Sequence, residues 1–180
     1  GGGKAVILQP EGASGGRPAF DREALFDAHG RAIEALGGRF VTGEDVGVSP
    51  ADLECVRRHT GHVAGLVSGA GDPAPYTARG VLRAMQAAAE WAWGSAELAG
   101  RRVAIQGCGA VGASLAAALR AAGADLVVAD LDAQRLAAVA AATGAEVASP
   151  DEILGARCDI LAPCALGGVL ARDRLEQLRC

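Results

Sequence analysis

The sequence lacks an uninterrupted apolar run close to the ~18 residues that a membrane-spanning helix requires, and no apolar signal-peptide core follows residues 1–4. It also lacks a basic surplus, since its formal net charge is −4 over 180 residues. We therefore expect neither a membrane nor a nucleic acid as partner, and we expect the protein to act in the cytoplasm.

The cysteines are odd in number and form no C-x-x-C pair, so the sequence predicts neither a disulfide framework nor a zinc site. The three histidines do not change this, although His59 and His62 lie one helical turn apart, because no suitably spaced cysteine or carboxylate accompanies them. We expect no metal. The five cysteines are Cys55, Cys108, Cys158, Cys164 and Cys180.

An initiator methionine is also missing, and the chain begins inside what looks like a glycine turn. We expect from this that the start of the chain is truncated. Apolar residues make up 51% of the chain and charged residues 21%, which is ordinary for a globular protein. The length allows one substantial core or two modest ones.

The first part of the chain mixes short apolar runs with one strongly periodic helix. Asp21 is a plausible N-cap for a helix that carries apolar residues at helical spacing and stops at Gly37-Gly38. A second helix should begin at Ser49-Pro50-Ala51-Asp52, which combines an N-cap, a proline at the first helical position and an acidic third residue. Short strands are expected at residues 4–9 (buried), 39–42 and 61–71.

The second part alternates strand and helix, which is typical of a parallel sheet with helical crossovers. The fold class predicted is α/β: a Rossmann-type doubly wound parallel sheet, incomplete at its C-terminal end, preceded by part of a smaller α/β substrate domain. We expect one domain at 1–74, an interdomain helix at 75–97 and a second, Rossmann-type domain at 98–180. Strands are expected at 102–106, 126–130, up to 147 and at 159–162, with helices at 110–122 and 133–143.

A G-x-G-x-x-G pattern follows the first of these strands and opens a helix, and this context gives the pattern its meaning. The first glycine permits the turn, the second lets a diphosphate approach the backbone, and the third lets strand and helix pack closely. Asp130 ends the next strand, where a carboxylate would bind the ribose hydroxyls of NAD and repel a 2′-phosphate, although Arg135 is near enough to keep NADP open. The alternative is a plain glycine turn, with Asp130 capping the helix at Ala133. The motif comprises Gly107, Cys108, Gly109, Ala110, Val111 and Gly112.

Two candidate catalytic residues stand in the first part. Lys4 follows three glycines, and a lysine confined and desolvated beside a small substrate could act as a general base. Asp45 lies in a loop between an apolar run and a capped helix, where it could serve the chemistry or simply accept hydrogen bonds from turn amides. Neither residue is decisive by its position alone.

Five segments in the same order resemble the leucine, phenylalanine and valine dehydrogenases, relatives of glutamate dehydrogenase. The resemblance extends over essentially the whole chain. The segments are GGGKAVI at 1–7, GRFVTGEDVG at 38–47, GDPAPYTARGV at 71–81, VAIQGCGAVG at 103–112 and CDILAPCALGGV at 158–169.

The resemblance implies NAD-dependent, reversible oxidative deamination of an apolar L-amino acid, leucine, valine, isoleucine or phenylalanine, to a 2-oxo acid and ammonium. It implies that Lys4 activates water for attack on an imine and that Asp45 exchanges protons with the substrate amine. Thr77 should meet the nicotinamide carboxamide. The other cofactor contacts implied are the motif at 107–112, Ala113, Asp130 and Leu131, and the turn of Pro163, Cys164 and Ala165, where Cys164 is a neighbour of the cofactor and not a nucleophile.

Some expectations rest on the family alone: the domain at 1–74 should bind the substrate and take part in oligomerisation, and the domain at 98–180 should bind NAD. The cleft should close by a hinge near 73–77, and the full-length protein should be a homo-oligomer. A second lysine that binds the substrate carboxylate would precede Gly1 in the family, so we expect the isolated chain to be inactive. A glutamate-type dehydrogenase and a non-catalytic NAD-binding remnant stay open as alternatives.

Overall fold

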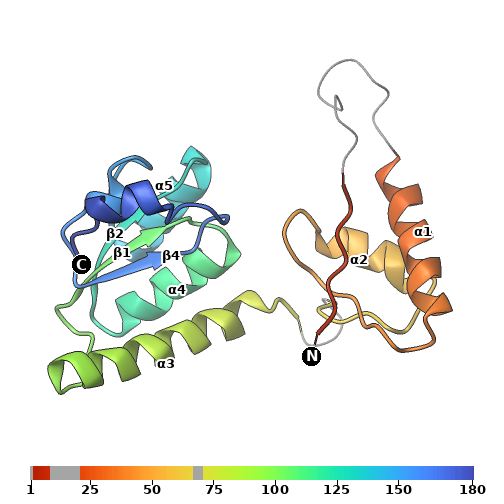
Figure 1. Cartoon of the computed structure of the whole chain (residues 1–180), viewed down its shortest axis with the longest axis horizontal. Coiled ribbons are helices and arrows are strands. Elements are labelled where there is room, and N and C mark those ends of the chain that lie inside the picture. The colour runs from red at the N-terminus through yellow and green to blue at the C-terminus, as the bar shows by residue number, and fades with distance from the viewer. Residues whose placement is uncertain (1, 9–20, 67–70) are drawn as a thin grey trace, which may run out of the picture. The chain divides into compact units, whose positions relative to one another are not determined.

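The structure is a computed structural model, and it describes residues 2–8, 21–66 and 71–180. The chain divides into two compact units, Gly1–Pro73 and Ala74–Cys180 (Figure 1). Within the described ranges, no helix is both long and apolar enough to cross a membrane.

The first unit contains two helices that begin where their capping residues predict. Helix α1 (Arg22–Ala35) starts after Asp21, whose side chain accepts a hydrogen bond from the Ala24 amide. Helix α2 (Pro50–Arg57) starts after Ser49, which forms a full capping box with Asp52. The helices pack closely at Gly30, where a Cβ would lie 2.8 Å from the carbonyl oxygen of Val56. Their buried apolar side chains are Phe26, Ile33, Leu53 and Val56.

The strands expected in this unit do not form as regular strands in its described part. Residues 2–8 have no assigned strand, and their side chains are exposed rather than buried; Val6 is 73% and Leu8 85% exposed. The other two segments meet in a single parallel bridge, Thr42 to Val63. A strand is stabilised by its neighbours, and among the described residues these segments have only that one pairing. Residues 9 and 67–70 of the expected strands lie outside the described residues.

The second unit opens with helix α3 (Ala74–Trp93) and contains a parallel four-stranded sheet. Its strands are β1 (Arg102–Gln106), β2 (Asp125–Ala129), β3 (Glu146–Val147) and β4 (Ile160–Pro163). The order β3-β2-β1-β4 reverses direction after β3, so the sheet is doubly wound and its switch point lies between β1 and β4. Gln106, the last residue of β1, pairs in register with Pro163 of β4.

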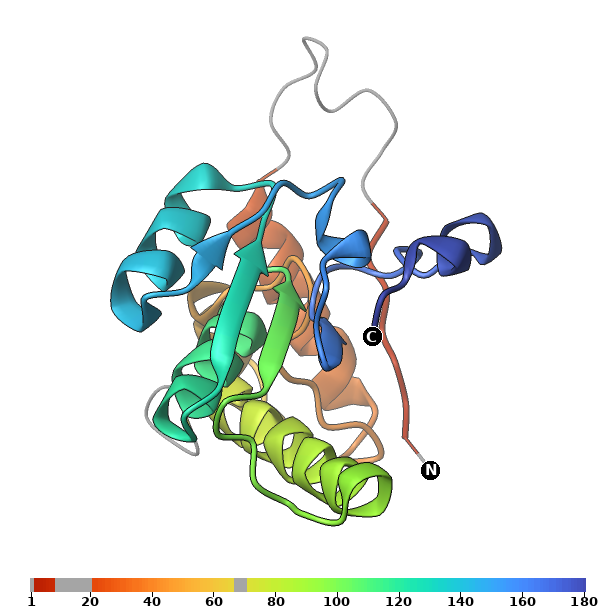
Figure 2. The same cartoon turned by 90° about the vertical axis from the view of Figure 1, so that its left-hand side faces the viewer.

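Apolar side chains cover both faces of this sheet, and Figure 2 shows its strands side by side. On one face lie α3, α4 (Ala110–Ala121) and α5 (Ala133–Thr143), around a core that includes Ile105, Leu115 and Val128. The other face is covered by the segment that joins β3 to β4, through Ile153 and Leu154. Alternate residues of β1, β2 and β4 point to opposite faces, which explains why the strands read as continuous apolar runs.

The sequence predicted the strands of this sheet closely. Two short 3-10 helices that the sequence did not predict flank β4: η1 (Ile153–Gly155) precedes it and η2 (Arg172–Gln177) follows it. Helix α3, which covers most of the segment 75–97, clusters with the second unit and packs on α4. Its buried Ala78, Met85 and Ala89 share the core of the sheet face.

Candidate functional site

The glycine turn after β1 is packed directly against the loop after β4. Gly107 has a φ of +98°, and a Cβ there would lie 2.7 Å from the amide nitrogen of Ala165. The Cys164 amide donates to the Gln106 carbonyl at 2.7 Å, which fixes the second loop to the end of β1. The turn therefore lies at the switch point, where parallel sheets of this kind bind their ligands.

The three motif glycines serve different physical purposes. A Cβ on Gly112 would lie 1.9 Å from the Gly107 carbonyl oxygen, so this glycine lets α4 begin against the turn. A Cβ on Gly109 would meet nothing within 4 Å, so open space lies beside this residue. Gly109 is also the N-cap of α4 and gives it no side-chain cap, which leaves the first-turn amides free of a capping side chain. Open space before a helix N-terminus suits a diphosphate.

Asp130 directly follows β2, and its carboxylate is held from two sides. One oxygen accepts a hydrogen bond from the Cys108 amide at 2.5 Å, and the other accepts from the Asp132 amide at 2.7 Å. The cap of α5 is Asp132, which accepts from the amides of Gln134 and Arg135. The alternative in which Asp130 merely caps that helix is therefore wrong.

The environment of the two cysteines of this site disfavours the thiolate form. Burial, with smaller contributions from Asp130 and Cys164, raises the pKa of the Cys108 thiol to about 11, and burial raises the pKa of the Cys164 thiol. Both stay protonated near neutral pH, and only a thiolate attacks efficiently. The expectation that Cys164 is merely a neighbour of the site agrees with this environment.

Gln106 is a residue that the sequence reasoning did not single out. It precedes Gly107 at the end of β1 and is only 8% exposed. Among the residues that the structure describes, its side-chain oxygen is the one buried side-chain polar atom without a hydrogen-bond partner. An unpaired buried acceptor is costly, and it stands at the edge of the sheet where a polar ligand would bind. The residues present thus fit a dinucleotide.

Two further expected contacts lie in the same unit. Thr77 stands in the first turn of α3, and Leu131 follows Asp130 with 91% of its surface exposed. Ala110, Val111 and Ala113 form the first turn of α4. The roles given to these residues by the resemblance stay predictions.

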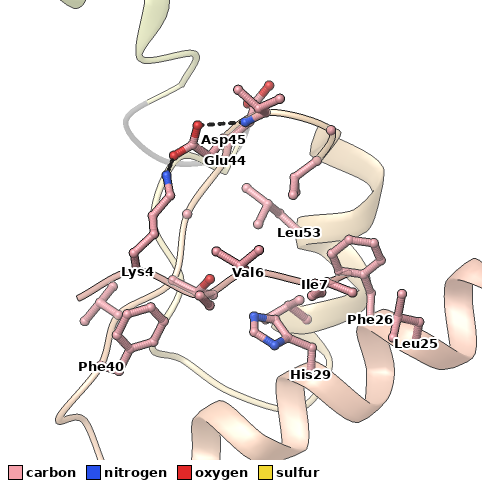
Figure 3. A pocket seen from close by; sticks show the side chains of 18 of the residues that line it. Lys4, Val6, Ile7, Leu25, Phe26, His29, Phe40, Glu44, Asp45 and Leu53 are labelled. Atoms are coloured by element: carbon pink, nitrogen blue, oxygen red, sulfur yellow. Dashed lines mark hydrogen bonds and ion pairs between the residues drawn. The ribbon is translucent and has the colours of Figure 1, made fainter. Parts of the chain in front are cut away.

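In the first unit, the structure brings Lys4 and Asp45 together. The Lys4 ammonium forms an ion pair with the Asp45 carboxylate (Figure 3). The pair lies at a pocket of about 740 Å³ whose apolar lining includes Val6, Phe26 and Leu53. The side chains of Lys4 and Asp45 are 65% and 51% exposed, so the confinement expected for Lys4 is not supplied by the described part of this unit.

Asp45 combines the two roles that the sequence left open. One carboxylate oxygen pairs with Lys4, and the other accepts a hydrogen bond from the Val46 amide at 2.7 Å. The Val48 amide donates to the Asp45 carbonyl at 3.0 Å and closes a tight turn. The same turn that fixes the carboxylate therefore presents it to the amine.

Lys4 is also the only lysine among the 17 lysine and arginine residues of the sequence. Arginine cannot release its proton at accessible pH, whereas an amine can. A chain that uses arginine at all its other basic positions keeps an amine beside Asp45. This signal was available in the composition and was missed.

Comparison with known protein families identifies the class of domain that the second unit forms. Residues 76–166 match the model of the family described as "D-isomer specific 2-hydroxyacid dehydrogenase, NAD binding domain". The fold and the turn thus define a Rossmann-type domain that binds NAD, and the chain belongs to this family of NAD-binding domains. The match begins beyond Lys4 and Asp45, so it does not cover the first unit.

Whole-chain comparisons narrow the relationship to amino-acid dehydrogenases. The chain is 42% identical to the leucine dehydrogenase of Geobacillus stearothermophilus over 183 residues, covering 99% of this chain and 48% of that protein. It is 40% identical to the phenylalanine dehydrogenase of Thermoactinomyces intermedius over 186 residues, covering 100% and 49%. The crystal structure of the L-tryptophan dehydrogenase from Nostoc punctiforme matches with a TM-score of 0.68 and 37% identity, covering 90% and 46%.

The resemblance to the leucine and phenylalanine dehydrogenases is thereby confirmed, at about 40% identity over nearly the whole chain. The chain spans about half the length of the curated relatives that it matches.

Proposed function

We propose that the protein is an NAD-dependent amino-acid dehydrogenase that oxidatively deaminates an apolar L-amino acid to its 2-oxo acid and ammonium. The observation that carries this proposal is the Lys4–Asp45 ion pair. The two residues lie far apart in sequence, in the part of the chain that the amino-acid dehydrogenases match and the hydroxyacid family does not. A proton-transferring pair is what deamination needs in addition to a cofactor.

In this mechanism, Asp45 takes up and returns the proton of the substrate amine. Removal of the α-hydride leaves an imine, and Lys4, with its proton released, accepts a proton from the water that attacks the imine carbon. Collapse of the resulting carbinolamine releases ammonia, which leaves as ammonium, and the 2-oxo acid. When bound, NAD supplies the hydride acceptor, and the protein contributes positioning and proton transfer.

For the cofactor, the proposed assignment follows the geometry of the second unit. The open space at Gly109 supports a diphosphate position before the N-terminus of α4. The fixed carboxylate of Asp130 supports a position for the adenosine ribose beside it. Arg135 lies 3.3 Å from Asp132 in an ion pair, which favours NAD over NADP because this cation is already engaged. The remaining contacts proposed are Thr77, Gly107, Cys108, Ala110, Val111, Gly112, Ala113, Leu131, Cys164 and Ala165.

The apolar substrate is supported by the relatives, which are named for leucine, phenylalanine and tryptophan. The apolar side chains beside the Lys4–Asp45 pair also suit such a substrate better than a charged one. Leucine, valine, isoleucine and phenylalanine are the candidates. We propose 1–74 as part of the substrate domain and 98–180 as the cofactor domain, with the helix at 75–97 between them.

We also propose that the protein works in the cytoplasm, where a soluble NAD pool serves amino-acid oxidation, and that it forms a homo-oligomer. Exposed apolar side chains of the first unit that do not line the pocket at the Lys4–Asp45 pair, among them Leu8 and Leu36, support an interface with a second copy. Light scattering that gives the mass of a single chain at micromolar concentration would contradict the oligomer.

The test is turnover by the full product of the gene that encodes this chain. We expect NAD reduction with L-leucine, L-valine or L-phenylalanine, and much less with L-glutamate. Lys4→Met and Asp45→Asn should each lower kcat by about 10²- to 10⁴-fold, the usual contribution of a positioned acid or base, while NAD affinity stays unchanged. Turnover that survives Lys4→Met, or that prefers a 2-hydroxy acid, would overturn the proposal. The isolated chain is expected to bind NAD without turnover.

A further inference from the structure

Arg22, the first residue of α1, joins three parts of the first unit. Its Nε and Nη2 atoms donate to the two carboxylate oxygens of Asp52, each at 2.7 Å, and Nη2 also donates to the Gly47 carbonyl at 2.6 Å. This bidentate fork fixes direction as well as distance, which a single-point contact does not. Arg22 therefore ties α1 to α2 and to the turn between them.

Asp52 is the rigid end of this connection. Its side chain is 7% exposed, and one of its oxygens also accepts from the amide and hydroxyl of Ser49, each at 2.7 Å. The Arg22 guanidinium, with smaller contributions from Ser49, lowers the pKa of Asp52 to about 2. The carboxylate is thus charged and fully engaged at all ordinary pH values.

Gly47 is the flexible end, because it belongs to the turn that starts at Asp45. The turn closes through the Val48 amide, and Gly47 has a φ of +77°, a conformation in which glycine adds no steric restraint. The hydrogen bond from Arg22 to the Gly47 carbonyl supplies a restraint from outside the turn. Asp45, two residues earlier, carries the carboxylate that pairs with Lys4.

We infer that Arg22 is a positioning residue: its fork on Asp52 and Gly47 holds the Asp45 turn so that the carboxylate faces the Lys4 amine. Arg22 donates its hydrogen bonds to Asp52 and Gly47 and not to Lys4 or Asp45, so it acts through the turn. The catalytic consequence rests on the proposed function, whereas the geometric one does not. Displacement of a catalytic carboxylate by about 1 Å can lower the rate of an enzyme by up to about a hundredfold.

The single lysine gives a direct readout of this geometry. Lysine labelled with ¹³C at Cε in the 180-residue chain gives one protein side-chain signal, that of Lys4. Asp45→Asn defines the position of this signal without its charged partner. We expect Arg22→Met to move the signal at least halfway toward that reference, and to speed amide exchange at Val46 and Val48 by about tenfold or more.

Arg57→Met is the matched control, because Arg57 is an arginine of α2 whose ion pair with Glu54 lies on the exposed helix surface. It should leave the Lys4 signal unmoved. Asp52→Asn keeps the size of the side chain but removes the charge that Arg22 binds. It should reproduce the effect of Arg22→Met, and it replaces that variant if Arg22→Met does not fold. An unmoved Lys4 signal in a folded Arg22→Met or Asp52→Asn variant overturns the inference.

Kinetics of the full gene product separate positioning from simple destabilisation. Below the unfolding temperature, Arg22→Met should lower kcat about tenfold or more while the KM for NAD stays within about twofold, and Arg57→Met should change neither. Equal kcat in the Arg22→Met and Arg57→Met proteins contradicts the inference. If the unsubstituted product shows no turnover, the proposed function fails, and the Lys4 signal alone decides the role of Arg22.

Discussion

The two units of this chain are held together in different ways. In the second unit, β1 and β2 lie in continuous apolar cores on both sheet faces, and the cofactor turn is defined by close backbone packing. In the first unit, the helices share a small core, and ionic contacts such as Arg22–Asp52 and Arg58–Asp27 join them. The position of the proposed proton-transfer pair therefore depends on ionic contacts, whereas the conformation of the cofactor turn depends on close packing. Substitutions in each unit and a change of pH test this contrast.

Gly112→Ala should break the second unit at its turn. Alanine normally favours a helix over glycine by about 1 kcal/mol, but a Cβ 1.9 Å from the Gly107 carbonyl oxygen forces strand and helix apart. We expect an unfolding free energy lower by about 3 kcal/mol or more and no measurable NAD binding, seen by thermal unfolding and calorimetric titration. Gly80→Ala in α3, where a Cβ meets nothing within 4 Å, is the control and should not destabilise. Equal stability of the two variants would refute the packing argument.

Acid should loosen the first unit through Asp52. Because the folded-state pKa of Asp52 is about 2 and its ordinary value is 3.8, its stabilisation is complete above about pH 4 and is lost as the pH falls toward 2. The contribution is about 2 kcal/mol. The difference in unfolding free energy between the unsubstituted chain and Asp52→Asn, measured with urea, should shrink over this pH range. Asp125→Asn in the second unit is the control. A difference that does not change with pH would sink the prediction.

Gly109→Ala should weaken NAD binding without changing the stability of the second unit. The added Cβ meets nothing within 4 Å, and the φ of −69° suits alanine, so the second unit should keep its stability. The same methyl group would occupy the space before α4 where the diphosphate is proposed to bind. We expect NAD affinity to fall about tenfold, or about 1.4 kcal/mol, in a titration. Unchanged affinity would show that the diphosphate binds elsewhere.

Asp130→Asn should change cofactor choice with the smallest effect. The substitution removes a charge that would repel a 2′-phosphate, and such a repulsion at about 4 Å in water is about 1 kcal/mol. The ratio of NADP to NAD affinity should therefore rise about fivefold, measured by competitive titration. Asp125→Asn, at the opposite end of β2, is the control. A ratio that rises equally in both variants would remove the special role of Asp130.

The accuracy of the elements predicted from the sequence also differs between the two units. The limits predicted for β1 and α5 agree with the structure, because the apolar periodicity that predicts them is local and lies within a core that reinforces it. The caps of α1 and α2 were also predicted correctly, from Asp21 and Ser49. The strand expected at residues 4–9 was wrong in its described part, because an apolar run forms a strand only when a partner pairs with it.

By itself, the sequence determined the Rossmann-type unit, the glycine turn and the two candidate residues Lys4 and Asp45, because these depend on local spacing and residue type. Only the tertiary structure decided that Asp130 is held by the Cys108 amide, that Cys164 and Ala165 lie against Gly107, and that Arg22 grips the turn of Asp45. Those contacts join residues distant in sequence, and no local pattern encodes them, since each is set by where packed elements bring their ends together.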